Sequence, residues 1–216
     1  MLVENIMKKD VITLPSTASI HEALQLLQKH RIRHIPIIDE INHVIGIVSD
    51  RDVRDASPSI FDNDSKQIEL QNDIQSIMSY PVITVHPLDF IDEVARIFYD
   101  EEFAAVPVVS NNKLVGIITE KDLLKTFIQL TGTHFQGSHI QVKVQDRPGI
   151  LPEVTSFFGK RKINIISLLI YSYKKDPHYK ILVIRFQTMN PSAIIEDLRN
   201  AGFHLMWPNN MQEPLL

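Results

Sequence analysis

The chain contains no cysteine among its 216 residues. This absence excludes disulfide bonds, catalysis by a thiolate and zinc sites built from cysteine. No uninterrupted apolar run approaches the roughly 20 residues that a membrane span needs. The N-terminus also lacks a basic stretch followed by an apolar one, so no signal peptide is expected. We therefore expect a cytoplasmic protein that does not insert into a membrane.

Patterns that would indicate an enzyme are missing as well. The sequence has no Gly-x-Ser-x-Gly elbow, no P-loop and no dinucleotide-binding fingerprint. The nine histidines show no spacing typical of metal ligands, and the carboxylates form no recognisable catalytic pair. We therefore expect no catalytic residue, no metal and no catalytic cofactor. A net charge of -4, with one short basic run at residues 160–162, argues against a nucleic-acid partner.

What the sequence does contain is an internal repeat. Three blocks begin at residues 6, 35 and 46 in the first copy and at 77, 106 and 116 in the second. The offset is 71 residues for the first two blocks (6 to 77, 35 to 106) and 70 for the third (46 to 116), so one single-residue gap aligns them. A repeat at a fixed offset predicts two stacked copies of one supersecondary unit.

Each copy is predicted to have the element order β-α-β-β-α. In the first copy, Val11-Ile12-Thr13 is the expected opening strand. A helix should follow, because Ser19 and Glu22 form a capping box ahead of an apolar stripe at helical spacing. Two β-branched runs then predict two strands, and a second helix is expected to begin near Ser49.

The second copy repeats these signals. Val82-Ile83-Thr84 is its expected opening strand, Asp89 the expected cap of its first helix, and Thr119 the start of its last helix. Between the copies, residues 54–73 are polar and rich in Ser, Pro, Asn and Asp, which predicts a loop.

The last part of the chain has a different pattern of apolar and polar residues. The composition changes at residues 131–138, where we expect a domain boundary. An alternating strand pattern follows, then a turn at 146–149 that leads into a helix, and a hairpin between 163 and 187. Asn190 is the expected cap of another helix, with Pro191 in its first position. The predicted order, β-α-β-β-α-β, is the ferredoxin-like arrangement.

The recurring block Gly-x-x-(Ser/Thr)-x-x-Asp combines groups that suit a nucleotide. Ser49 and Thr119 are expected at helix starts, where free N–H groups and the helix dipole favour an anion. Asp52 and Asp122 follow one turn later, where a carboxylate can accept hydrogen bonds from both ribose hydroxyls. The alternative interpretation is an N-cap followed by an ordinary first-turn acid. Spacing alone leaves both interpretations open.

The repeat resembles a tandem pair of CBS (cystathionine-β-synthase) domains, a Bateman module, since every block occurs twice in the same order. The resemblance covers residues 3–60 and 74–130. Asp146-Arg147-Pro148-Gly149, with Asn164-Ile165 downstream, resembles an ACT domain over residues 138–210. The expected fold class is therefore α/β and α+β, with a CBS pair followed by a ferredoxin-like ACT domain.

The CBS resemblance implies that an adenine nucleotide (AMP, ADP or ATP) binds in clefts of the pair, with phosphate on the block's hydroxyl and ribose on its Asp. Arg33 and His34 can neutralise phosphate in one cleft, whereas Ala104 and Ala105 cannot in the other, so unequal sites are expected; the alternative for Arg33 and His34 is an exposed strand edge. The expected nucleotide-binding residues are Thr13, Arg33, His34, Pro36, Ser49, Asp50, Arg51, Asp52, Thr84, Pro107, Thr119, Lys121 and Asp122.

The ACT resemblance implies edge-to-edge pairing and an amino acid or other small metabolite bound near the 146–149 turn. Gly149 lets a ligand approach the backbone, and the helix N-terminus could receive a carboxylate. The alternative is a turn that serves dimerisation alone. The expected ligand-contacting residues are Asp146, Arg147, Pro148, Gly149, Ile150 and Leu151.

Together these resemblances imply a non-enzymatic regulator that forms a homodimer and acts on an unidentified protein. The combination of a CBS pair with an ACT domain at this length is similar to proteins of acetoin utilization. That similarity implies a role in acetoin or butanediol catabolism, through control of acetyl-CoA synthesis. The alternative function is an amino-acid-sensing ACT regulator in which the CBS pair is a dimerisation scaffold.

Overall fold

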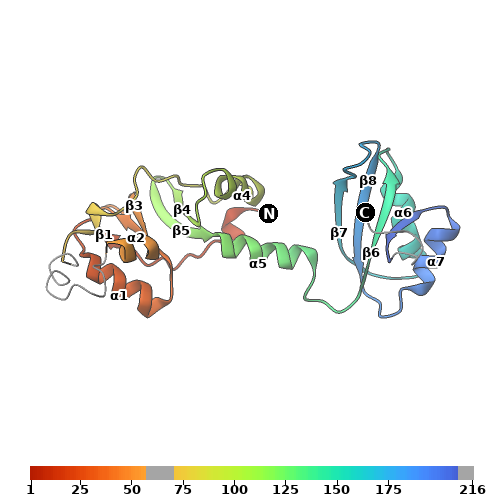
Figure 1. Ribbon diagram of the computed structural model, residues 1–216, viewed down its shortest axis with the longest axis horizontal. Helices are drawn as coiled ribbons and strands as arrows, with labels where there is room; N and C mark the ends of the chain where they lie inside the picture. Colours follow the sequence, from red (N-terminus) through yellow and green to blue (C-terminus); the bar gives the residue numbers. More distant parts are fainter. Residues whose placement is uncertain (57–70, 209–216) are drawn as a thin grey trace. The chain divides into compact units, whose positions relative to one another are not determined.

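The computed structural model describes residues 1–56 and 71–208. The chain divides into two compact units, Met1–Leu124 and Lys125–Leu216 (Figure 1). The division falls inside helix α5 (Glu120–Thr131), ahead of the domain boundary expected at 131–138, and the helix ends where that composition change begins. Most of the loop predicted over residues 54–73 lies outside the described residues.

The first copy has the predicted β-α-β-β-α order. Its elements are β1 (Leu14–Pro15), α1 (Ile20–His30), β2 (His34–Ile38), β3 (Val44–Ser49) and α2 (Asp50–Asp55). β1 pairs in parallel with β2, and β2 pairs antiparallel with β3. The prediction of a strand at Val11-Ile12-Thr13 is wrong by a few residues, since ladder pairing begins only at Leu14, where the side chain becomes buried.

The predicted capping box of α1 is present. The Ser19 hydroxyl accepts a hydrogen bond from the backbone N–H of Glu22 at 3.2 Å, and a Glu22 carboxylate oxygen accepts one from the Ser19 N–H at 2.7 Å. These bonds satisfy two N–H groups that have no partner inside the helix. Ile20, Ala23 and Leu27 then place the apolar stripe in the core of the first copy.

The second copy repeats the architecture with a shorter opening. Its elements are α4 (Ile91–Asp100), β4 (Ala105–Ser110), β5 (Lys113–Thr119) and α5. The strand predicted at Val82-Ile83-Thr84 is not formed. Instead Val85 alone makes a parallel bridge to Val108, with its N–H bonded to the Pro107 carbonyl at 3.1 Å. The counterpart of β1 is thus reduced to one residue.

The cap predicted for α4 is also wrong. Asp89 does not cap the helix, because one of its carboxylate oxygens accepts a hydrogen bond from the backbone N–H of His86 at 2.7 Å. Phe90 occupies the N-cap position and supplies no side-chain hydrogen bond. The carboxylate therefore stabilises the turn before the helix instead of the helix itself.

The segment that precedes each copy packs into the core of the other copy. The 3₁₀ turn η1 (Val3–Asn5) comes before the first copy, yet Val3 is fully buried in the core of the second. The 3₁₀ turn η2 (Ile74–Ser76) comes before the second copy, yet Ile74 is fully buried in the core of the first. Figure 1 accordingly shows the red N-terminal segment beside α4 and α5. This exchange joins the two copies into one unit.

The recurring glycines serve this exchange. Met78 lies over Gly46 and Met7 lies over Gly116, so closely that a Cβ atom on either glycine would collide with the methionine sulfur. The glycine of the Gly-x-x-(Ser/Thr)-x-x-Asp block therefore recurs with the Ile-Met dipeptide because the two pack together. Its presence is explained without any ligand.

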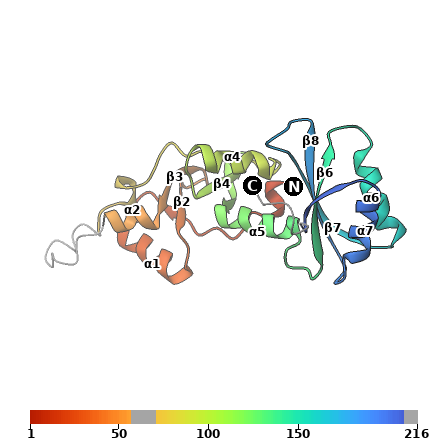
Figure 2. The same cartoon turned by 45° about the vertical axis from the view of Figure 1, so that its right-hand side comes forward.

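The C-terminal unit is ferredoxin-like, as predicted. Its elements are β6 (Ser138–Gln145), α6 (Ile150–Lys160), β7 (Ile165–Ser172), β8 (Tyr179–Phe186), α7 (Ser192–Asn200) and β9 (His204–Trp207). The sheet is antiparallel with the order β7-β8-β6-β9. Both helices cover one face of the sheet (Figures 1 and 2) and bury Phe158, Leu198 and Phe186 between the layers.

Helix α7 begins one position later than predicted. Pro191 occupies the N-cap position instead of the first helical position, and Ser192 is the first helical residue. Asn190 is consequently outside the helix, but its side-chain oxygen still accepts a hydrogen bond from the Ser192 N–H at 3.2 Å. The local signal was correct and its register was wrong by one residue.

Candidate functional site

In the first copy, Ser49 and Asp52 are joined where β3 ends and α2 begins. Asp52 Oδ2 accepts hydrogen bonds from the Ser49 backbone N–H and from its hydroxyl, both at 2.7 Å. The Ser49 hydroxyl in turn accepts one from the Asp52 N–H at 3.2 Å. His34, the first residue of β2, lies directly across the strand pair from Ser49. Ser49 therefore caps α2, and these bonds fix the orientation of the Asp52 carboxylate.

The second copy builds the same arrangement with Thr119 and Asp122. Asp122 Oδ2 accepts from the Thr119 N–H at 3.0 Å and from its hydroxyl at 2.5 Å. The other carboxylate oxygen, Oδ1, lies 3.9 Å from the ammonium group of Lys8. Sequence reasoning missed Lys8, although it lies in a recurring block in which its counterpart, Ser79, is uncharged.

His34 is half-buried among charged groups from both copies. Burial lowers its pKa below the usual 6.5, and nearby Arg33 acts in the same direction. The carboxylates of Asp50 and Asp52, and that of Glu120 from the second copy, oppose this shift more weakly than burial drives it. The structure thus favours the neutral imidazole of His34. Because Asp50 and Asp52 begin α2 and Glu120 begins α5, their shared influence on His34 shows that the starts of the two helices lie near each other. Arg33 itself is exposed.

The predicted threonines and prolines have two different environments. Thr13 directly precedes β1 and Thr84 directly precedes Val85, and both are half-buried at equivalent places. Pro36 and Pro107 are buried inside β2 and β4, opposite Ile47 and Ile117 respectively. The threonines can therefore present a hydroxyl to a ligand, whereas the prolines contribute shape to the strands.

The remaining predicted charges lie in the first turns of α2 and α5. Asp50 forms an ion pair with Arg54, with 3.2 Å between guanidinium nitrogen and carboxylate oxygen. Arg51 and Lys121 are exposed at equivalent positions of the two helices. The long side chains of Arg51 and Lys121 extend into solvent, where a bound anion could attract them.

The predicted ACT turn is exposed, and its charged side chains are paired. Gly149 adopts φ +86°, a conformation that favours glycine, and forms the N-cap of α6. Arg147 binds Glu153 through two hydrogen bonds of 2.7 and 2.6 Å, which lower the pKa of Glu153. Asp146 pairs with Lys180 at 2.8 Å. These pairs hold the turn in place.

The other predicted ACT residues differ in exposure. Pro148 is exposed at the tip of the turn. Ile150 and Leu151 are half-buried and pack against the core of the unit. A ligand at this turn would therefore meet the backbone around Gly149, where nothing lies within 4 Å of the position that a Cβ atom would take.

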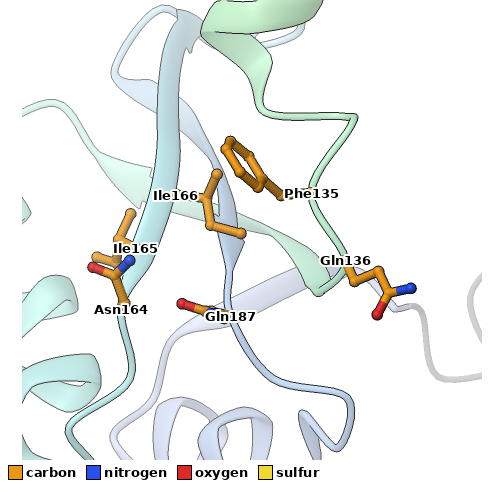
Figure 3. A pocket seen from close by; sticks show the side chains of 6 residues that line it. All are labelled: Phe135, Gln136, Asn164, Ile165, Ile166 and Gln187. Carbon is orange, nitrogen blue, oxygen red and sulfur yellow. The ribbon is translucent and has the colours of Figure 1, made fainter.

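A cavity of about 370 Å³ lies at the opposite end of the same sheet (Figure 3). It forms where β6 and β7 begin and β8 ends, since Ser138 and Ile165 both pair with Phe186 there. Its lining residues are Phe135, Gln136, Asn164, Ile165, Ile166 and Gln187. The cavity therefore combines apolar and amide side chains without a charged one. Sequence reasoning noted Asn164 and Ile165 only as family markers.

Residues 1–56 and 71–208 contain neither a metal-binding cluster nor a membrane-spanning helix. No group of three or more histidine or acidic side chains in this part of the chain could hold a metal ion. None of its helices is long and apolar enough to cross a membrane.

Comparison with protein families gives two matches. The CBS domain family matches residues 3–59 and 74–128, which together make up more than half of the chain. The ACT domain family matches residues 138–203.

Similar individual proteins match mainly over part of their length. The chain is 35% identical over 127 residues to an L-aspartate semialdehyde sulfurtransferase of Methanocaldococcus jannaschii. The aligned region covers 58% of this chain but only 23% of that enzyme.

Similar solved structures include two CBS proteins. One is the CBS domain pair of protein MJ0100 in complex with 5′-methylthioadenosine and S-adenosyl-L-methionine, with 34% identity, a TM-score of 0.51, and coverage of 59% of this chain and 95% of that one. The other is a putative acetoin utilization protein (AcuB) from Vibrio cholerae, with 30% identity, a TM-score of 0.54, and coverage of 62% and 95%.

Proposed function

The chain belongs to the CBS domain family and carries a C-terminal ACT domain, and from this premise we propose that it is a non-enzymatic regulator that binds an adenosine-containing ligand in the clefts of its CBS pair. The observation that carries the proposal is the paired arrangement of Ser49 with Asp52 and of Thr119 with Asp122. In each pair one carboxylate oxygen orients the side chain at the end of a strand. The other oxygen can then accept from ribose hydroxyls.

The comparison with MJ0100 supports an adenosine ligand. Both molecules named in that complex, 5′-methylthioadenosine and S-adenosyl-L-methionine, contain adenosine, and that domain pair is 34% identical to this chain. A hydrogen bond from a hydroxyl to a carboxylate contributes about 1.5–3 kcal/mol. Two such bonds at the ribose suit AMP, ADP and ATP equally, since all three share it.

The two clefts are proposed to differ in their preference for phosphate. Arg33 directly precedes β2 and His34 is its first residue, whereas Ala104 and Ala105 hold the equivalent positions at the start of β4. A cation within a few ångströms stabilises phosphate charge. The proposal therefore assigns the more phosphorylated ligand to the cleft beside Ser49.

Calorimetric titration tests the proposal. AMP, ADP and ATP would be titrated into the parent protein and into the Asp52→Ala and Asp122→Ala variants. Removing the ribose acceptor should weaken binding about tenfold or more at the cleft concerned, because a hydrogen bond to a charged group is lost. Binding that both variants retain at full strength would contradict the proposal.

A second candidate function is amino-acid sensing by the ACT domain, with the CBS pair as a scaffold. The observation that favours it is the exposed backbone at Gly149, at the start of the eleven-residue helix α6. A carboxylate could bind N–H groups there. Titration of amino acids in the same calorimeter separates the two functions. Heat with an amino acid and none with any adenosine ligand would favour the second candidate.

The cellular role is a further part of the proposal. The 30% identity to the AcuB structure supports a regulatory role in acetoin or butanediol catabolism, in the cytoplasm and through an unidentified target protein. A strain without the gene should then grow normally on glucose and poorly on acetoin. Equal growth on both carbon sources would count against this role.

A further inference from the structure

The segments that precede the two copies, which we call the leading segments, differ in sequence, and one of the differing positions, Lys8, lies beside the Asp122 carboxylate. The backbone of Lys8 is bonded to that of Ile117 by two hydrogen bonds of 2.9 Å. Its counterpart Ser79 is bonded to Ile47 in the same way, at 2.9 and 3.2 Å. The exchange of segments therefore fixes both residues at equivalent places beside the strand that leads to the Ser/Thr–Asp pair. Only one of them carries a charge.

The side chain of Lys8 extends to the carboxylate of Asp122, the ribose acceptor of the cleft proposed beside Thr119, which we call the second cleft. Its ammonium lies 3.9 Å from Asp122 Oδ1, while Oδ2 of the same carboxylate is bonded to Thr119. The Asp122 side chain is 12% exposed and the Lys8 side chain 57%. The carboxylate is thus held in place, whereas the long ammonium side chain can reorient toward a ligand that contacts Asp122.

We propose that Lys8 determines the ligand charge that the second cleft accepts, so that this cleft selects adenosine ligands with an anionic 5′ group over neutral ones. The assignment rests on the proposed function of the cleft. When ribose hydroxyls bind Asp122, the ligand's 5′ group enters the space that the Lys8 ammonium can reach. An anionic group there gains a charge interaction that a neutral one does not.

The repeat supports this division of roles. The first cleft has the uncharged Ser79 but gains cationic character from Arg33 and, when protonated, His34. The second cleft has Ala104 and Ala105 in their place but gains Lys8. Each proposed cleft is therefore supplied with a cation by a different part of the chain, by Arg33 directly before β2 in one case and by the segment that precedes the first copy in the other. The alanines do not make the second cleft indifferent to phosphate.

Calorimetry in an Asp52→Ala background, which silences the first cleft, tests the proposal with AMP and adenosine as probes. Lys8→Met should weaken AMP binding about five- to tenfold, the effect of one partly screened charge. Adenosine affinity should stay unchanged. Lys9→Met, which removes the exposed neighbouring cation, is the matched control and should change neither affinity. Raising the salt concentration should reduce the preference for AMP only where Lys8 is present.

A charge exchange provides a second test. The Lys8→Ser/Ser79→Lys variant should lose the AMP preference of the second cleft and strengthen AMP binding at the first, measured in the Asp122→Ala background. Equal losses of AMP and adenosine affinity in Lys8→Met would overturn the proposal, because Lys8 would then be structural. An unchanged AMP preference would overturn it too. No binding of either probe by the parent protein would overturn the proposed function, and this assignment with it.

Discussion

His34 experiences opposing influences of burial and charge. Burial disfavours the imidazolium and lowers the pKa of His34, although the carboxylates of Asp50, Asp52 and Glu120 favour the charged form. In the unfolded chain the imidazole has its ordinary pKa, so it takes up a proton before the folded protein does as the pH falls. Folding stability therefore decreases when the pH falls through the region near 6.5.

The His34→Gln variant tests this residue-scale effect. Its melting temperature should fall less than that of the parent protein between about pH 7.5 and 5.5, because the protonation difference between folded and unfolded states is removed. Thermal unfolding followed by circular dichroism at both pH values measures this. His30→Gln, at an exposed helix end, is the control and should follow the parent. A loss in His34→Gln as large as in the parent would contradict the burial argument.

The exchanged 3₁₀ turns are the elements that make the two copies interdependent. Val3 of η1 and Ile74 of η2 are both fully buried, each in the core of the copy that its segment does not precede. Neither copy completes its core without the other's leading segment. The two copies should consequently unfold together as one cooperative unit.

Truncation of these anchors is the element-scale prediction. Ile74→Ala should destabilise the N-terminal unit by about 2–5 kcal/mol and Val3→Ala by about 2 kcal/mol, through lost burial and cavity formation. Denaturant unfolding measures both, and each variant should shift a single transition. Ile41→Ala, at a side chain that is 60% exposed, is the control and should have little effect. Separate transitions for the two copies would show that the exchange does not couple them.

At the scale of the whole molecule, the β7 edge of the C-terminal sheet has no strand on its outer side within the described chain. β7 is an edge strand, and Leu169, Ile170 and Tyr171 on it are 38%, 43% and 49% exposed. Consecutive exposed apolar residues on an edge strand favour pairing with another strand, because they leave backbone groups and apolar surface available. A second copy of the chain is the expected partner.

Light scattering checks this expectation. The parent protein should have twice the 24.8 kDa mass of one chain. The Leu169→Lys/Tyr171→Lys variant should shift toward monomer, since charges on an edge strand oppose strand pairing. Met189→Lys, at a residue that is 80% exposed outside the strands, is the control and should remain dimeric. A monomeric parent protein would refute the dimer.

Much of the architecture followed from local signals. The Ser19–Glu22 box, the β-branched strands and the Ser49 and Thr119 helix starts were predicted correctly, because capping and side-chain periodicity act within a few residues. The errors at residues 82–84, at Asp89 and at Pro191 occurred where ladder pairing or a competing turn decided the outcome. Such competition cannot be read from composition.

The candidate site likewise combines features that the sequence shows with features that only the tertiary structure shows. The Ser49–Asp52 and Thr119–Asp122 pairs were visible in the sequence, since each joins residues three positions apart. The position of Lys8 beside Asp122 was not visible, because it depends on a segment that enters the core of the other copy and bonds to Ile117, more than 100 residues away. Sequence spacing specifies contacts within a helix turn, whereas contacts between copies arise only when the two apolar cores form together.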